Sequence, residues 1–472
     1  MSTQAKAFWA FVVTAIGLFM VTLDNLVVTM ALPVIRDDLG ASLEQLEWTV
    51  NAYTLTFAVL LLTGAALGDR FGRRRMFVIG MGIFTLASAA AALAPSADTL
   101  VIARALQGVG GAIVTPLTLT ILSRAVSAEK RGVALGAWGG IAGLAVALGP
   151  LVGGAVVQGI SWQWIFWLNV PIGLAVIPLA LRKLDESRGP NTSLDLPGLA
   201  LGSAGLFGIV FGVVQGNGEG WTSPVILGSI AAGIALVAAF VLWELRAPAP
   251  LLPMRFFRNR TFLWTNVASL LFYFGMFGAI FLLSQFLQVV QGYSPLDAGL
   301  RTLPWTAMPM FIAPVAGALS DRIGGRPLLA TGLAMQAGAL AWLAAVSEPG
   351  VAYGTLVAPF IVAGIGMSLF FAPVANMILG SVRREEEGQA SGANNAIREL
   401  GGVFGVAVLA AVFAHYGGYE TPEAYVDGLV PAVWVGAIVV GLGAIAALAV
   451  PRLRRRRAAA EAREEAALPE AA

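Results

Sequence analysis

The sequence contains no cysteine and only one histidine, His415. Without cysteine, neither a disulfide framework nor a thiolate metal site can form, and a single histidine excludes a multi-histidine metal centre. The chain also has no Walker lysine motif for nucleotide phosphates and no usable Ser/His/Asp set. We therefore expect no resident metal, no cofactor and no catalytic residue, and the protein is not expected to be an enzyme.

Charge is scarce as well. Only 12% of the 472 residues are charged, whereas soluble domains have about 25%. Hydrophobic residues make up 58% of the chain, and the mean hydropathy is +0.80. Apolar runs of about 20 residues, the length that crosses a hydrocarbon core, recur from end to end. A buried core helix could explain one such run but not all of them.

These runs predict an all-α membrane protein, because backbone groups in lipid must be hydrogen-bonded within their own segment. They lack the alternation expected of barrel strands. Fourteen transmembrane helices are predicted, near residues 8–32, 47–68, 76–95, 100–122, 132–157, 164–181, 197–215, 223–243, 261–290, 299–319, 328–346, 353–379, 394–416 and 429–450.

The positive-inside rule predicts how these helices are oriented. Of the 29 Lys and Arg residues, Arg36 and Arg301 fall on one side, and Arg104 and Arg398 fall within spans. The other 25 (29 − 4) fall on the opposite side, which we predict to be cytoplasmic and to carry both termini. The first apolar run is too long for a signal peptide. We therefore expect a multi-pass membrane protein, and the Ala-, Gly- and Arg-rich composition, typical of a GC-rich bacterial genome, favours a bacterial inner membrane.

A charged loop occurs twice in the chain. Residues 64–75 read GAALGDRFGRRR, and residues 317–327 read GALSDRIGGRP. The two copies are eight predicted helices apart, so spans one to six correspond to spans nine to fourteen. The predicted domains are a six-helix bundle (1–185), a two-helix insertion (186–258), a second six-helix bundle (259–451) and a cytoplasmic tail (452–472). Parallel repeats of this kind are typical of transporters whose binding site lies between the halves.

Five stretches resemble motifs of the major facilitator superfamily, and specifically of its fourteen-helix drug/proton antiporter branch. Residues 64–75 resemble the signature loop of the superfamily, with Gly68 where alanine is more usual. The other four stretches resemble motifs of helices one, four, five and six, and they occur in that order at residues 23–33, 104–110, 143–154 and 162–173.

The resemblance implies the major facilitator fold, with two six-helix bundles and two extra transmembrane helices. It also implies a proton-coupled multidrug efflux antiporter that exports lipophilic, often cationic drugs by alternating access. The expected partners are a lipophilic small-molecule substrate, protons as the coupling ion and membrane lipids, and not nucleic acid. The protein is expected to be a monomer. Two alternatives stay open: a dedicated proton-driven exporter of one natural product, lipid or amino acid, and a non-transporting membrane scaffold or sensor.

Asp24 and Arg104 are ionisable residues within predicted spans. A charged aspartate near the bilayer centre costs about 2.5–3.5 kcal/mol, so such a residue indicates a partner or a function. The depths of the two residues below the same membrane face differ by only about 5 Å. We predict that Asp24 takes up the coupled proton from outside and releases it inside, and that Arg104 faces the cavity and tunes Asp24. The resemblance also assigns this arginine to proton coupling. A purely structural ion pair is the alternative.

Arg398 and Glu399 are drawn into the membrane because the apolar run after them is only about 15 residues long, shorter than a span. Neighbouring residues on a helix point about 100° apart, so the two side chains cannot pair face to face. Antiporters of this branch commonly have an amide near position 399, so the glutamate is a departure. Glu399 could be a second proton site, an acidic contact for a cationic substrate or part of a salt bridge near the cytoplasm.

The repeated loop is predicted to act as a gate. Asp69 can lie near a helix N-terminus, where an anion is favoured, or meet arginines, and we predict that it stabilises the state closed on the cytoplasmic side. The residues assigned to this gate or latch are Gly64, Asp69, Arg70, Gly72, Arg73, Asp321 and Arg322.

The fifth helix carries closely spaced small residues that favour close helix approach, and a proline that favours a kink. In the antiporters that the chain resembles, this helix forms a pliable contact between the halves. The residues concerned are Gly143, Gly149, Pro150, Gly153 and Gly154.

Aromatic and amide side chains within the spans are candidates for substrate contacts, because such surfaces suit lipophilic ligands. Packing or interfacial anchoring is the alternative for each of them. The candidates are Asn25, Trp48, Asn51, Tyr53, Phe57, Gln107, Tyr273, Phe277, Phe281, Gln285, Asn376 and Asn395.

Overall fold

The computed structural model describes residues 3–126, 131–188, 195–383 and 386–451. Within these ranges the regular structure is helical and includes no strand. The α-helices are α1 (Thr3–Leu39), α2 (Leu43–Phe71), α3 (Arg73–Ala92), α4 (Ala97–Ala125), α5 (Arg131–Gly159), α6 (Trp164–Trp167), α7 (Asn169–Lys183), α8 (Leu196–Glu219), α9 (Pro224–Glu244), α10 (Arg260–Gln285), α11 (Pro295–Thr306), α12 (Met308–Ile323), α13 (Gly325–Val346), α14 (Tyr353–Leu379), α15 (Glu387–Tyr416) and α16 (Pro422–Leu448). A short 3₁₀ helix, η2 (Met254–Arg258), precedes α10, and a π-helical turn, η3 (Phe286–Val290), follows it.

Helix starts follow local capping chemistry. At the start of α2, the Ser42 hydroxyl accepts a hydrogen bond from the Gln45 backbone N–H at 3.2 Å, and the Gln45 side-chain oxygen accepts one from the Ser42 N–H at 3.0 Å. This reciprocal pair satisfies two backbone donors that the first turn leaves free.

The two charged loops share a different feature. Gly72 between α2 and α3 has φ of 108°, and Gly324 between α12 and α13 has φ of 85°. Only glycine adopts a positive φ without a steric penalty. The two copies of the charged loop therefore share the same backbone feature.

Eleven described helices are long and apolar enough to cross a membrane, and the number is twelve if the bent helix α2 counts as one span. α2 bends by 51° between Leu61 and Thr63. The prediction of an all-helical membrane protein is therefore confirmed. The predicted total of fourteen stays a prediction, because α11 and α12 are separate helices that are each shorter than a membrane span, and most side chains in the first part of α5 lie outside the described residues, which leaves Leu148–Gly159 as its described apolar segment. Pro304 and Pro309 flank the break between α11 and α12, and each lacks the N–H that a continuous helix would use.

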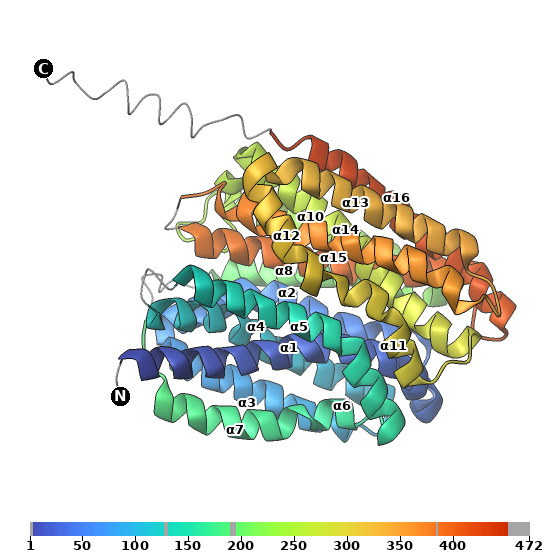
Figure 1. Ribbon diagram of the computed structural model, residues 1–472, viewed down its shortest axis with the longest axis horizontal. Helices are drawn as coiled ribbons and strands as arrows, with labels where there is room; N and C mark the ends of the chain where they lie inside the picture. The colour runs from blue at the N-terminus through green and yellow to red at the C-terminus, as the bar shows by residue number, and fades with distance from the viewer. Residues whose placement is uncertain (1–2, 127–130, 189–194, 384–385, 452–472) are drawn as a thin grey trace, which may run out of the picture.

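Two groups of helices form the body of the molecule (Figure 1). In the first half, α1 packs on α4, α5 and α7, and α4 also packs on α2 and α3. In the second half, α10 packs on α15 and α16, and α13 packs on α14 and α16. The hairpin α8–α9 lies at the seam, where α8 contacts α2 of the first half and α15 of the second. The seam between the halves is where a rocking transporter would place its substrate.

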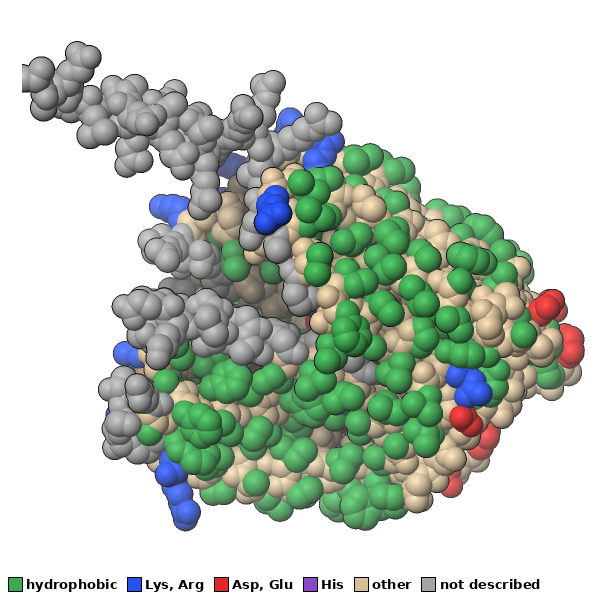
Figure 2. All heavy atoms as spheres, in the orientation of Figure 1, with side chains coloured by type: hydrophobic (Ala, Val, Ile, Leu, Met, Phe, Trp, Pro, Cys, Tyr) green, Lys and Arg blue, Asp and Glu red, His purple; other side chains and the backbone are tan. Residues whose placement is uncertain are grey.

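The two ends of the bundle differ in charge, and we call them the basic face and the acidic face. Figure 2 shows Lys and Arg side chains mainly at the left end and Asp and Glu side chains at the right end. The basic face carries the beginning of α1 and the loops of Asp69 and Arg322, whereas the acidic face carries Glu44, Asp98 and Glu348. The predicted tail, residues 452–472, lies outside the described residues.

Candidate functional site

A buried polar network surrounds Asp24 in the middle of α1. The Asp24 carboxylate accepts hydrogen bonds from Arg104 Nη1 at 2.5 Å, Gln107 Nε2 at 3.0 Å and Asn169 Nδ2 at 2.6 Å. The Ser88 hydroxyl oxygen accepts two further bonds, from Gln107 at 2.8 Å and from Asn169 at 3.3 Å. Helices α1, α4 and α7 therefore meet at one carboxylate, and α3 joins them through Ser88. The charge of Asp24 is thus satisfied inside the first half.

Arg104 is held from a second direction by α2. Its Nε donates to the Thr49 carbonyl oxygen at 3.1 Å, and its guanidinium lies 4.3 Å from the centroid of the Tyr53 ring. The Tyr53 hydroxyl in turn donates to the Val21 carbonyl oxygen at 3.2 Å. The contact between Arg104 and Asp24 agrees with the depth argument from the sequence. The expectation that Arg104 faces the cavity is wrong, since α2 covers the side chain and leaves it 0% exposed.

Two members of the Asp24 network, Ser88 and Asn169, were not singled out from the sequence. Asn169 lies within the stretch 162–173, which resembles the helix-six motif, but nothing in its local pattern indicates that it meets Asp24. The two residues are 145 positions apart. Only the packing of α7 beside α1 brings them together.

A cavity of about 1080 Å³ lies between the halves. Its wall is mainly apolar and aromatic, with residues from both halves, and it extends to Leu379 at the end of α14 on the basic face. In Figure 2 the surface is hollowed between the halves towards this end. The volume is slightly above the roughly 300–1,000 Å³ range of small-molecule sites.

Seven of the twelve candidate substrate contacts line this cavity. They are Asn25, Tyr53, Phe57, Tyr273, Phe277, Asn376 and Asn395. The other five lie elsewhere. Gln107 belongs to the Asp24 network, and Asn51 and Phe281 are buried away from the cavity. Gln285 accepts a hydrogen bond from the Tyr419 hydroxyl at 2.7 Å, and the Trp48 ring lies 5.8 Å from that of Phe207 on α8.

Sequence reasoning missed several cavity residues, including Phe370 and Phe371 on α14. The Phe370 ring stacks on that of Phe272, with centroids 3.9 Å apart. Phenylalanine is common in every apolar span, so its type alone does not distinguish a cavity wall from the helix core or the lipid face.

Arg398 and Glu399 both line the cavity from α15. Arg398 donates to the Tyr273 hydroxyl and, at 3.1 Å, to the Asn395 side-chain oxygen. Among the described residues it forms no salt bridge, with Glu399 or with any other carboxylate. This arrangement agrees with the helical geometry that keeps adjacent side chains from facing each other.

The first charged loop is held by two carboxylates. Asp69, in the last turn of α2, accepts from Arg73 Nε at 2.9 Å and Arg73 Nη2 at 2.8 Å. The N-terminus of α3 is occupied by Glu186 instead, which accepts from the backbone N–H groups of Arg74 at 3.0 Å and Arg75 at 3.1 Å. An anion at a helix N-terminus is stabilised by the aligned peptide dipoles. Asp69 therefore pairs with an arginine of its own loop in this conformation.

The other predicted latch residues are less engaged. Arg70 and Arg322 are exposed, and the Asp321 side chain lies outside the described residues. Gly64 permits close packing of α2 on α4, because a Cβ there would lie 2.3 Å from the Ala112 carbonyl oxygen.

The corresponding basic end of the second half uses a different ion pair. Glu386, just before α15, binds Arg255 at 2.8 Å and Arg383 at 3.0 Å. The hydrogen bond from Arg383 lowers the pKa of the Glu386 carboxyl.

Helix α5 makes close contacts in two directions. A Cβ on Gly149 would lie 2.6 Å from Leu26 Cβ, and one on Gly153 would lie 2.8 Å from the Val27 carbonyl oxygen, both on α1. A Cβ on Gly154 would lie 2.2 Å from the Pro295 carbonyl oxygen of α11, in the other half. The close helix approach predicted from the spacing of Gly149 and Gly153 is thus found at both, and Gly154 adds a close contact with the other half.

Pro150 also faces the other half, because its carbonyl oxygen lies 2.3 Å from where a Cβ on Gly299 would be. The surroundings of Gly143, the remaining predicted residue of this helix, lie outside what the structure describes.

The halves also meet through hydrogen bonds near the acidic face. Ser284 donates to the Thr29 carbonyl oxygen at 3.3 Å, and Gln288 donates to the Met30 carbonyl oxygen at 3.2 Å. The Arg36 guanidinium lies 3.8 Å from the centroid of the Tyr419 ring. The cavity is therefore closed towards the acidic face.

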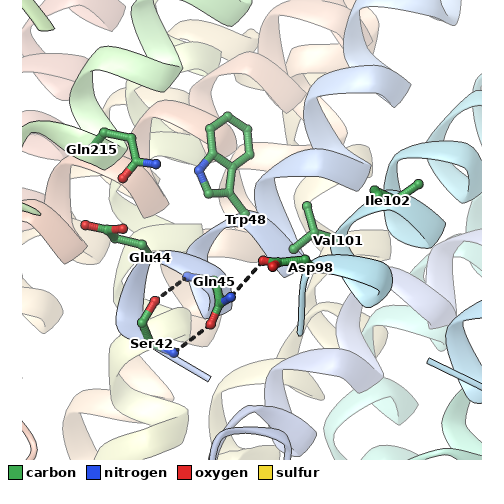
Figure 3. A pocket seen from close by; sticks show the side chains of 8 residues that line it. All are labelled: Ser42, Glu44, Gln45, Trp48, Asp98, Val101, Ile102 and Gln215. Atoms are coloured by element: carbon green, nitrogen blue, oxygen red, sulfur yellow. Dashed lines mark hydrogen bonds between the residues drawn. The ribbon is translucent and has the colours of Figure 1, made fainter. Parts of the chain in front are cut away.

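A second, smaller pocket of about 600 Å³ lies on the acidic face between α2, α4 and α8. Figure 3 shows Gln45 between Ser42 and Asp98, with Trp48 and Gln215 above them. Gln45 Nε2 donates to Asp98 at 2.7 Å, so one of the two acidic side chains that line this pocket is already hydrogen-bonded by the protein. This pocket is remote from the Asp24 network, and we assign no function to it.

Comparisons with known proteins agree with this architecture. The family model of the Major Facilitator Superfamily matches residues 14–406 and 302–471. The chain therefore belongs to the major facilitator superfamily, a family of membrane transporters, and is not an enzyme. It is a multi-pass membrane protein.

Two curated relatives are similar over most of the chain. The tetracenomycin C resistance and export protein of Streptomyces glaucescens is 34% identical over 421 residues, which cover 89% of this chain and 78% of the relative. The multidrug resistance protein Stp of Mycobacterium tuberculosis is 35% identical over 408 residues, which cover 85% and 75%.

The fold also matches a solved structure. A crystal structure of the peptide transporter POT in complex with sulfate aligns with a TM-score of 0.67 and 15% identity, over 96% of this chain and 100% of that one. At this identity the match supports the fold alone.

Proposed function

We propose that this protein exports lipophilic small molecules in exchange for protons, by alternating access. The observation that carries the proposal is a buried, ionisable Asp24–Arg104 pair beside a large cavity that is closed at one end of the seam between two halves. Relatives named for drug resistance and antibiotic export support the same conclusion.

The proposed orientation has the basic face and both termini in the cytoplasm, with fourteen spans in total. In this count, α6 with α7 and α11 with α12 each form one broken span. The chain would divide into bundles 1–185 and 259–451, an insertion 186–258 and a lipid-binding tail 452–472, and would act as a monomer. The described conformation would then be inward-facing.

In the proposed cycle, Asp24 takes a proton when the acidic face is open to the outside. Protonation removes the charge that holds Arg104, Gln107 and Asn169 together, and this loosens α1 from α4 and α7. Substrate enters the cavity from the basic face, and loss of the proton to the cytoplasm restores the network. A conformational equilibrium can be driven in this way only if the proton binds the two states with different affinity.

The experiment is transport into inverted membrane vesicles with an imposed pH gradient, acidic inside. We expect gradient-driven uptake of a lipophilic dye with the wild-type protein and none with Asp24→Asn. The control is binding of the same dye to the purified variant, which should persist because Asp24 does not line the cavity. Uptake by Asp24→Asn that equals wild type would exclude this residue as the coupling site.

A dedicated exporter of one natural product, lipid or amino acid is the second candidate. It is favoured by the relative named for a single compound, tetracenomycin C. A panel of chemically unrelated dyes and antibiotics separates the two, because a dedicated exporter would transport one class only.

A further inference from the structure

The charge of the cavity wall comes from one half of the molecule. Among the described residues that line the cavity, Arg398 and Glu399 are the charged ones. Asp24 and Arg104 do not reach it, and both side chains are fully buried in the first half. Selection of a substrate by charge must therefore depend on α15 in the second half.

The Arg398 guanidinium is held by neutral groups. Its Nη atoms donate to the Tyr273 hydroxyl and the Asn395 amide oxygen, and its buried Nε has no partner among the described residues. Arg104, by contrast, is neutralised by Asp24 at 2.5 Å. Arg398 is thus a positioned cation whose charge no carboxylate pairs with directly. A planar guanidinium fork fits a carboxylate or an ionised phenol, with charge-assisted hydrogen bonds.

The aromatic residues around Arg398 are placed for the same kind of ligand. The guanidinium carbon lies 4.5 Å from the Tyr273 ring centroid and 5.7 Å from that of Phe371. One face of Tyr273 is therefore occupied by the protein's own cation and is not free to bind a cationic ligand. The Phe277 ring stacks with that of Tyr273, with centroids 5.5 Å apart, and provides an apolar surface for a flat ring system.

Glu399 gives this site a charge of opposite sign. Adjacent helical residues do not face each other, so a ligand can meet Glu399 without displacing Arg398. An acidic ligand at Arg398 would be repelled by an ionised Glu399, whereas a basic ligand would be attracted. Arg398 therefore attracts an acidic ligand, and Glu399 opposes that attraction.

From these contacts we propose that the cavity selects planar aromatic molecules with an acidic group, a carboxylate or an ionised phenol, which binds at Arg398. Glu399 weakens this binding. The inference rests on the proposed export function and specifies its substrate class, in place of the cationic class that the family resemblance implies.

The experiment measures equilibrium binding of two similar xanthene dyes, anionic fluorescein and cationic rhodamine 123, to the purified full chain by fluorescence anisotropy. We expect wild type to bind fluorescein more tightly than rhodamine 123. Arg398→Gln should weaken fluorescein binding at least about tenfold, the scale of losing one partner of a desolvated charge pair. Rhodamine 123 binding should stay the same or tighten, which also reports that the cavity is intact. Arg398→Lys should retain part of the fluorescein affinity, since it keeps the charge without the fork.

Glu399→Gln is the matched variant, one residue away, and should tighten fluorescein binding. Fluorescein affinity that is unchanged in Arg398→Gln, preference of wild type for rhodamine 123, or no binding of either dye by wild type would overturn the inference. If Arg398→Gln binds neither dye, Glu399→Gln decides: tighter fluorescein binding supports the inference and unchanged binding overturns it. Vesicle transport separates this from the proposed function, because binding selectivity without proton-driven uptake would reject only the exporter.

Discussion

Single residues differ in this protein mainly in whether their charge is neutralised inside the fold. Arg104 and Asp24 are completely buried and bind each other, whereas the hydrogen bonds that Arg398 makes to other described residues are with neutral groups at the cavity wall. Two arginines on equally apolar helices therefore have different chemistry. The proposed proton site and the proposed site of charge selection therefore lie in different halves of the molecule.

The buried pair should be strongly coupled in stability. We predict that Asp24→Asn and Arg104→Gln each destabilise the purified protein by about 3–5 kcal/mol, because either leaves one buried charge without its partner. The double variant should lose much less than the sum of the two. The free energies of unfolding of the wild type and all three variants, measured in one detergent, complete this double-mutant cycle. Losses that simply add would show that the two side chains are not energetically coupled.

At the scale of elements, the loop between α2 and α3 depends on a residue far along the chain. Glu186 follows α7 and caps α3 with both carboxylate oxygens. The Cβ of any residue at Gly72 would lie 2.8 Å from this carboxylate. A side chain at position 72 would therefore clash with the Glu186 carboxylate that caps α3.

We predict that Glu186→Ala lowers the free energy of unfolding by about 0.5–2 kcal/mol, the range found for losing a helix N-cap. Asp185→Ala is the control, since it removes the same charge from the neighbouring position. Asp185 binds Lys6 at 2.8 Å, but the two side chains are 71% and 45% exposed, so its loss should cost about 0–1 kcal/mol. Thermal unfolding of both variants checks the order. Equal shifts in Tm would contradict a specific capping role.

For the whole molecule, the equilibrium between the conformation open at the acidic face and the one open at the basic face should depend on contacts at opposite ends of the seam. The acidic face is closed by backbone contacts such as Gly154 with Pro295. Asp69 on the basic face pairs within its own loop here, which is consistent with its predicted role as a latch engaged only when that face closes.

We predict that Gly154→Val opens the acidic face, because its side chain would clash with the backbone of α11, and that Asp69→Asn shifts the population towards the open basic face. The chain has no cysteine, so a single Met276→Cys substitution in the cavity wall reports access from each side. Labelling with an impermeant maleimide should rise from the acidic face in the first variant and from the basic face in the second.

Gly159→Val is the control for the helix change, since a Cβ there has nothing within 4 Å. Its labelling should match that of the parent protein. A Gly154→Val variant with the parent pattern would contradict the role of this contact in closure. Unchanged access in Asp69→Asn would do the same for the latch.

The amino-acid sequence by itself determined that this protein lies in a membrane and that its architecture is duplicated. Long uncharged runs can satisfy their backbone only as helices in lipid, and glycine at positions 72 and 324 marks the two equivalent loops. The meeting of Asp24 with Arg104 was also predictable, because both lie at similar depth and neither charge is stable alone in an apolar medium.

Tertiary structure alone decided which polar residues share a site. Asn169 reaches Asp24, Glu186 caps α3, and Arg104 is shielded by α2 because helices distant in sequence pack side by side. A helical span is apolar on most of its surface, so its pattern does not reveal which side faces a partner helix, a cavity or lipid. Arg398 and Arg104 look alike along the chain, and only the neighbours supplied by the fold leave one paired and the other open to a ligand.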